Sequence, residues 1–110
     1  MATVLVKMNF CDFTHRITVT QRDDGDLDVK IESECENVKD FAKNLGGRIT
    51  MEDVTVREGS KLSDPGILAP LTMTCLVANG VLDAAWLELG MLSQATARKV
   101  GGNEISYEEI

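Results

Sequence analysis

Hydrophobic and polar residues alternate along the first third of the chain, in three separate runs. Apolar side chains occupy every second position of residues 4–10, and the same period returns at 13–20 and at 27–32. A period of two is typical of strands that have one buried face. The pattern therefore predicts three strands joined by short turns.

The turn between the second and third strands determines how they pair. A three-residue loop pairs Val19 with Val29 and Ile17 with Ile31, whereas a two-residue loop would mismatch their apolar faces. The last loop residue is then Gly25, at a left-handed bulge position. We expect a hairpin with this register.

The run at 30–47 predicts the end of a strand, a complete amphipathic helix and a helix stop. Ser33 and Glu36 have the spacing of a capping box, so Ser33 is expected to be the N-cap. Apolar residues recur three and four positions apart, at Val38, Phe41, Ala42 and Leu45. Gly46 supplies the stop. Cys35 then lies in the first turn, where unpaired amides favour a thiolate and the flanking glutamates oppose it.

The second half of the chain carries weaker signals. We expect a fourth strand with a bulge at 48–56, followed by a turn-rich loop at 57–70 in which an Asp-Pro pair caps one helical turn. The apolar stretch at 75–89 predicts a second helix, and alternation at 104–108 predicts a terminal edge strand. The elements predict one α+β domain in the order β-β-β-α-β-α-β, with two helices on one face of a largely antiparallel sheet of four or five strands.

The second helix is expected to begin at a Thr74 cap and to be buried almost all round. Gly80 in its interior costs about 1 kcal/mol relative to alanine, which predicts a close backbone approach at that point. Trp86, with Met91 and Leu92 after it, predicts an apolar contact surface. A homodimer through this surface is therefore one expectation.

Composition and charge argue against several classes of partner. The 110 residues include 18 acidic and 11 basic side chains, and the net charge of −7 opposes nonspecific binding to nucleic acid or to an anionic membrane. The N-terminal stretch lacks the features of a secretory signal, and no apolar run approaches the roughly 20 residues needed to cross a bilayer. We expect a cytoplasmic protein, whose three cysteines remain thiols or ligands.

Cysteines fall at the boundaries of the predicted elements. Cys11 follows the first strand, and Cys35 and Cys75 stand at the starts of the two helices. Extending the hairpin register places His15 opposite Ser33, so the segments that carry the first two cysteines are expected to meet at one end of the sheet.

Three thiolates suit a zinc ion or an iron–sulfur cluster, with Asp12 or His15 as the candidate fourth ligand. The sequence thus predicts a metal site formed by Cys11, Cys35 and Cys75. The alternative is that the cysteines are small buried hydrophobic residues, with His15 a hydrogen-bonded and partly buried side chain.

Two further functions fit the same residues. A thiol enzyme or sulfur carrier would use Cys35 as nucleophile, His15 as base and Cys75 as resolving thiol. A non-catalytic dimerisation or adaptor module would depend on the apolar helix around Trp86. Nucleotide binding and serine hydrolysis are not supported, because the chain has no Walker loop, no G-x-G-x-x-G and no G-x-S-x-G motif.

Three segments carry a resemblance to a known family, and in order they read NFCDFTHRITV, VKIESECENVKDFAKNL and CLVANGVLDAAWLELGML. They resemble small uncharacterised three-cysteine proteins found mainly in methanogenic archaea and other anaerobes. The resemblance spans nearly the whole chain and implies that Cys11, Cys35 and Cys75 are the family's cysteines, in an anaerobic cytoplasm. It departs at Asp12, where a glycine is expected. A looser likeness, of arrangement only, is to iron–sulfur scaffold proteins.

Overall fold

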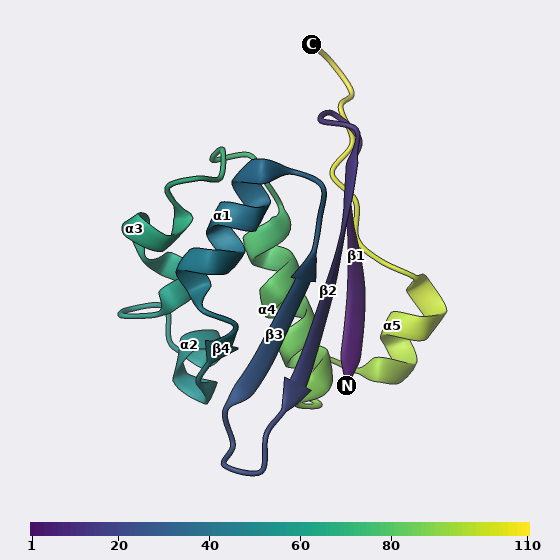
Figure 1. Ribbon diagram of the computed structural model, residues 1–110. Helices are drawn as coiled ribbons and strands as arrows, with labels where there is room; N and C mark the ends of the chain where they lie inside the picture. Colours follow the sequence, from purple (N-terminus) through teal and green to yellow (C-terminus); the bar gives the residue numbers. More distant parts are fainter.

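A four-stranded antiparallel sheet forms the centre of the protein (Figure 1), whose computed structural model describes residues 1–110. Its strands lie side by side in chain order, as β1 (Ala2–Met8), β2 (Phe13–Gln21), β3 (Leu27–Glu32) and β4 (Arg48–Ile49). The α+β class and the antiparallel sheet expected from the sequence are confirmed.

The hairpin of β2 and β3 has the predicted register. Val19 pairs with Val29, and Ile17 pairs with Ile31. The turn contains Gly25 with a φ of 92°, a left-handed conformation that side chains rarely adopt. Odd-numbered residues of β2 are mostly buried and even-numbered ones mostly face solvent, so one face of the sheet is covered and the other is open.

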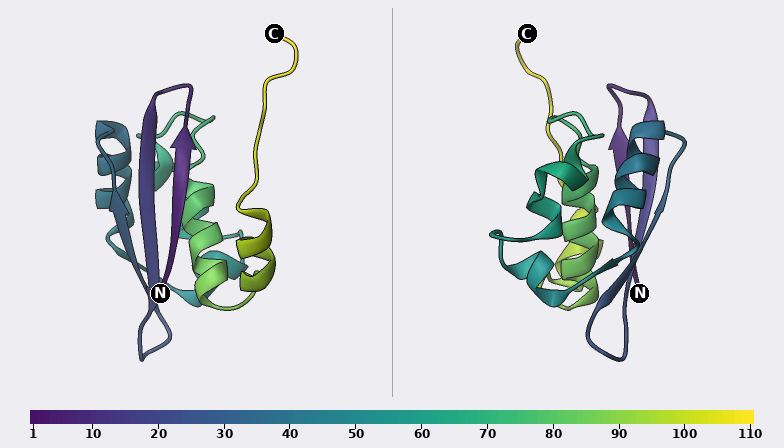
Figure 2. Two further views of the ribbon diagram at one scale, coloured as in Figure 1. Left: turned by 90° about the vertical axis from the view of Figure 1, so that its right-hand side faces the viewer. Right: turned by 60° about the vertical axis from the view of Figure 1, so that its left-hand side comes forward.

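Helix α4 (Val77–Glu88) covers that face, lying along β1 and β2 (Figure 2). The helix comes closest to the sheet at Gly80. A Cβ atom at this position would clash with Cγ2 of Val6 and would lie 2.8 Å from Cδ1 of Ile17. The close backbone approach predicted for Gly80 is confirmed.

The start of α4 differs from the prediction by two residues. Its N-cap is Leu76, and no side chain caps the helix. Thr74, the predicted cap, pairs its hydroxyl with that of Thr72 instead. Cys75 therefore lies in the connection that leads to the helix. Neither α4 nor any other helix combines the length and the apolar character needed to span a membrane.

Helix α1 (Glu36–Leu45) lies beside β3 and ends as predicted at Gly46, whose φ is 84°. Its buried side chains are Val38, Phe41 and Leu45. The predicted capping box at its start is wrong, since the N-cap is Cys35. The Ser33 hydroxyl accepts a hydrogen bond from the N–H of Cys35 (2.9 Å) and not from an amide of the helix.

Residues 51–55 form a helix where the sequence predicted the second part of a strand. Helix α2 (Met51–Thr55) begins at a capping box made by Thr50 and Asp53. The Thr50 hydroxyl accepts from the N–H of Asp53, and the Asp53 carboxylate accepts from the N–H of Thr50. These bonds satisfy amides at the helix start, so β4 ends after two residues.

Three short helices complete the chain. The 3₁₀ helix η1 (Lys61–Ser63) precedes α3 (Pro65–Leu68), which is capped by Asp64 as the Asp-Pro pair predicted. Helix α5 (Gln94–Val100) follows α4. The predicted terminal strand is wrong, because residues 101–110 have no regular structure and their apolar side chains are exposed. Their alternation therefore corresponds to no buried face.

Candidate functional site

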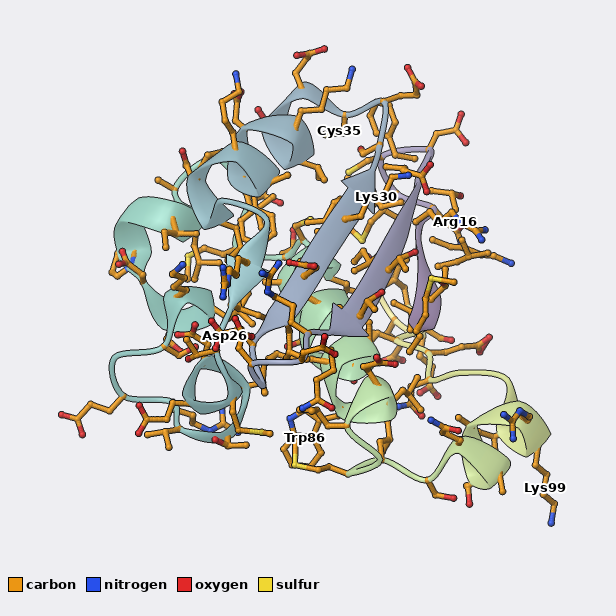
Figure 3. The ribbon with its side chains drawn as sticks, turned by 60° about the horizontal axis from the view of Figure 1, so that its bottom comes forward. Arg16, Asp26, Lys30, Cys35, Trp86 and Lys99 are labelled. Atoms are coloured by element: carbon orange, nitrogen blue, oxygen red, sulfur yellow. The ribbon has the colours of Figure 1, made fainter.

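The three cysteines lie on three connections at one end of the sheet. Cys11 is in the turn between β1 and β2, Cys35 lies between β3 and α1, and Cys75 precedes α4 (Figure 1). All three are free; Cys11 is exposed, while the other two are half-buried against the core. Figure 3 shows that Cys35 is remote from Trp86, at the other end of the molecule. The fold thus gathers the connections that carry the cysteines.

Electrostatic coupling connects the three thiols. Burial is the main influence that raises the pKa of Cys75, and negative charge on Cys35 and on Cys11 raises it further. The N–H of Val77, the first residue of α4, lowers the same pKa. Two thiolates close enough to oppose ionisation of a third would be stabilised together by a cation.

The two longest helices begin at or shortly after a cysteine and have no side-chain cap. Cys35 is itself the N-cap of α1, and Cys75 lies just before the N-cap of α4. Every other helix has a capping hydroxyl or carboxylate, from Thr50, Ser60, Asp64 and Ser93. The first-turn amides of α1 and α4 therefore have no side-chain cap, and at α4 the N–H of Val77 lowers the pKa of Cys75 instead.

His15 is a buried residue of β2. Only 2% of its surface is exposed, and its Nδ1 atom lies 2.7 Å from the Ser33 hydroxyl oxygen. Burial lowers the pKa of His15, so the imidazole is neutral at pH 7. The predicted position opposite Ser33 and the expected hydrogen bond are both confirmed. The bond goes to a hydroxyl, and no hydrogen bond joins His15 to a thiol.

Asp12 occupies a left-handed position beside Cys11. Its φ of 60° is the one positive value outside glycine, in a tight turn closed by hydrogen bonds from the N–H groups of Cys11 and Asp12 to the carbonyls of Met8 and Asn9. This conformation accounts for the expectation of glycine at residue 12. An aspartate is among the residues that tolerate it best, and Asp12 directly follows the exposed Cys11 in the chain.

A metal ion would need a rearrangement of the cysteines. No three side chains of His, Cys, Asp and Glu are placed closely enough to hold a metal ion together. The single coordination sphere expected for Cys11, Cys35 and Cys75 is therefore not formed in this arrangement. The donor set nevertheless fits a soft metal, since it offers three sulfur atoms and the carboxylate of Asp12.

Two features of the site were missed by the sequence reasoning. The first is the Ser33 hydroxyl, which serves Cys35 and His15 and does not cap α1. The second is the absence of a cap at α4, where Thr74 was expected. The placement of His15 opposite Ser33 was the available signal for the first, because it put a second hydrogen-bonding partner within reach of the hydroxyl.

Comparisons with known proteins identify a family. A family model described as "Family of unknown function (DUF6951)" matches residues 2–100. No curated protein and no solved structure matches the chain.

Proposed function

The chain belongs to this family of unknown function (DUF6951), and we propose from its own side chains that it binds a soft metal ion or an iron–sulfur cluster through Cys11, Cys35 and Cys75. The observation that carries the proposal is that the connections holding Cys11, Cys35 and Cys75 lie at one end of the sheet (Figure 1), although these residues are far apart in the chain. Thiols that are buried at random in a core have no reason to share one region, whereas ligands of one metal do. The setting that we propose is an anaerobic archaeal cytoplasm, where thiols and clusters persist.

The helix termini support this chemistry. A metal-bound cysteine is a thiolate, and the N–H of Val77 at the start of α4 lowers the pKa of Cys75, which favours that form of the side chain. When bound, zinc or a cluster would supply the positive charge that offsets the mutual repulsion of the thiolates.

Asp12 is the better candidate for the fourth ligand. It adjoins Cys11 in an exposed turn, whereas His15 is almost fully buried and its Nδ1 atom is occupied by Ser33. Because Cys11 is the exposed member of the three, we infer that closure of the site requires movement of the turn between β1 and β2 towards Cys35 and Cys75.

Metal binding is tested by anaerobic purification, metal analysis and titration with Co²⁺. We expect one Co²⁺ per chain with thiolate-to-cobalt charge-transfer absorption, which weakens in each of the single variants Cys11→Ser, Cys35→Ser and Cys75→Ser. Asp12→Asn keeps the size of the side chain and should reduce the affinity without loss of the thiolate absorption. Reconstitution with ferrous iron and sulfide distinguishes a cluster from a single ion.

The matched control is Ser93→Ala, which removes the cap of α5 and no thiol. A wild-type protein that binds no Co²⁺ and forms no cluster would contradict the proposal, as would binding that survives all three cysteine replacements.

The hydrogen bond of His15 argues against the thiol-enzyme alternative, and labelling of the cysteines tests it. That reaction needs a base at Cys35, and the hydrogen bond of His15 goes to Ser33. Iodoacetamide should modify the three cysteines at rates that follow their exposure, with Cys11 first. Selective modification of Cys35 that His15→Asn abolishes would instead favour a nucleophilic thiol.

A further inference from the structure

We propose that His15 and Ser33 are positioning residues for Cys35, and that they hold the backbone of this cysteine so that its thiol faces the other two. The inference rests on the proposed function, because it assigns a supporting layer to the same site. It adds two residues that are not cysteines to the proposed site, and it gives the buried His15 a role other than metal ligand or catalytic base.

The first step is the link through the Ser33 hydroxyl. The Ser33 oxygen accepts a hydrogen bond from the N–H of Cys35 (2.9 Å) and lies 2.7 Å from Nδ1 of His15. A hydroxyl has one proton and two acceptor lone pairs, so it can bond to both groups in either tautomer of the imidazole. Ser33 therefore joins the side chain of His15 to the backbone of Cys35.

The second step is what these bonds leave free at Cys35. Its N–H is bonded to Ser33, and its carbonyl accepts a hydrogen bond from the N–H of Lys39 (3.0 Å). Both polar groups of its backbone are thus fixed, with φ of −78° and ψ of 121°. The remaining freedom of the thiol is rotation about the Cα–Cβ bond.

The third step compares Cys35 with the other cysteines. The N–H groups of Cys11 and Cys75 bond to carbonyls three residues earlier, at Met8 and Thr72, as in ordinary turns. Only Cys35 is held through a side chain that is bonded to another strand. His15 belongs to the middle of the sheet and is almost fully buried, so the pair transmits the rigidity of β2 to the thiol.

The local sequence supports a functional reason for this arrangement. Ser33 has the spacing needed to cap α1, and capping is its most common use in such a position. Here the hydroxyl serves His15 and Cys35, while the helix start remains without a side-chain cap. A residue that stabilised only the helix would not be diverted in this way.

The experiment compares Ser33→Ala with the conservative Ser33→Thr, in two measurements on the full chain. Ser33→Ala should weaken Co²⁺ binding by about 10- to 100-fold, as is typical when a supporting hydrogen bond of a metal ligand is removed. It should also change the pH profile of the iodoacetamide reaction at Cys35, read by mass spectrometry. Ser33→Thr keeps the hydroxyl and should restore both.

The matched control is Ser60→Ala. Ser60 forms the same kind of link, since its hydroxyl accepts from the N–H of Leu62 two residues ahead and donates to the distant carbonyl of Asp53. It serves no cysteine. The control should lose stability and leave both measurements at Cys35 unchanged, which separates positioning from general destabilisation.

The outcomes distinguish this inference from the proposed function. If the wild-type protein binds no Co²⁺, the proposed metal site fails, and the alkylation profile alone decides the role of Ser33. If Ser33→Ala reacts at Cys35 like the wild type, or if Ser33→Thr fails to restore the profile, the positioning role is overturned whatever the metal result. His15→Asn should support positioning better than His15→Leu, because an amide can hydrogen-bond to the Ser33 hydroxyl and an alkyl side chain cannot.

Discussion

Replacing Gly80 with alanine tests the packing of α4 against the sheet. The new Cβ would clash with Cγ2 of Val6 and lie 2.8 Å from Cδ1 of Ile17, and both of these side chains are buried. Overpacking costs about 1–3 kcal/mol, and two simultaneous contacts favour the upper end of that range. Alanine recovers about 1 kcal/mol through its higher helix propensity. We expect the free energy of unfolding to fall by about 2 kcal/mol.

Urea unfolding, followed by the fluorescence of the single tryptophan Trp86, measures this loss. The midpoint should fall while the dependence on denaturant stays constant, and the thermal midpoint should fall by about 8–16 °C. Asn79→Ala is the matched control, since Asn79 is an exposed neighbour of Gly80 on the same helix. That variant should equal or slightly exceed the wild type in stability.

A double variant separates the clash from other effects of alanine. Val6→Ala removes the methyl group that the new Cβ would strike, and alone it should cost about 2 kcal/mol of buried apolar contact. Combined with Gly80→Ala, the total loss should be smaller than the sum of the two by about 1 kcal/mol or more. Strict additivity, or a Gly80→Ala variant as stable as the wild type, would refute the close approach.

Three other variants test the cap, the histidine and the tryptophan. Asp53→Ala breaks the capping box with Thr50 and should lower the free energy of unfolding by about 1–2 kcal/mol. Burial raises the pKa of Asp53, but its hydrogen bonds lower that pKa more. The stability contributed by this carboxylate should therefore be lost in the wild type as the pH falls below about 4, and the variant should show no such loss. Burial lowers the pKa of His15, so as the pH falls the histidine of the unfolded chain is protonated before that of the folded chain. Wild-type stability should therefore decline as the pH falls from about 7 to 5, and the stability of His15→Asn should not. Trp86→Phe removes the hydrogen bond from Nε1 to the carbonyl of Val54 (2.8 Å) and should cost about 1 kcal/mol in urea unfolding followed by circular dichroism, since the variant has no tryptophan. Light scattering on the same variant tests whether the 37% exposed ring contributes to a homodimer.

Local patterns were sufficient wherever the neighbours in sequence are also neighbours in space. The pairing of Val19 with Val29 followed from loop length and the position of Gly25, because a hairpin closes on itself within a few residues. The apolar face of α1 followed from its period, and its end followed from Gly46. Both elements could be predicted from their own residues, without information from the rest of the chain.

Patterns failed where a short alternation had no partner to confirm it. The alternation of Val54 and Val56 predicts a strand, but Thr50 and Asp53 have the spacing of a capping box, and in the structure these two residues start a helix. The alternation around Tyr107 has no strand beside it, so the segment stays irregular and exposed. Two or three alternating apolar residues are therefore insufficient to predict a strand unless a neighbouring strand can pair with them.

The candidate site was predictable in place but not in detail. The hairpin register predicted that the connections carrying Cys11 and Cys35 would lie at one end of the sheet, while the helix signal predicted Cys75 at a helix start. The bonding of Ser33 depends on His15, eighteen residues earlier, so no local rule could reveal that the hydroxyl would serve the cysteine and not the helix.

The residues that place the thiols lie outside the cysteine connections. Side chains alternate between the two faces of a strand, so a slip of one residue in the hairpin would turn Ser33 away from His15, and the turn at Gly25 prevents that slip. Gly80 sets how closely α4 lies on the sheet, and with it the position of Cys75 just before the helix. The spacing of the thiols is therefore determined by strand register and helix packing, which is the physical reason that no short cysteine motif appears in this sequence.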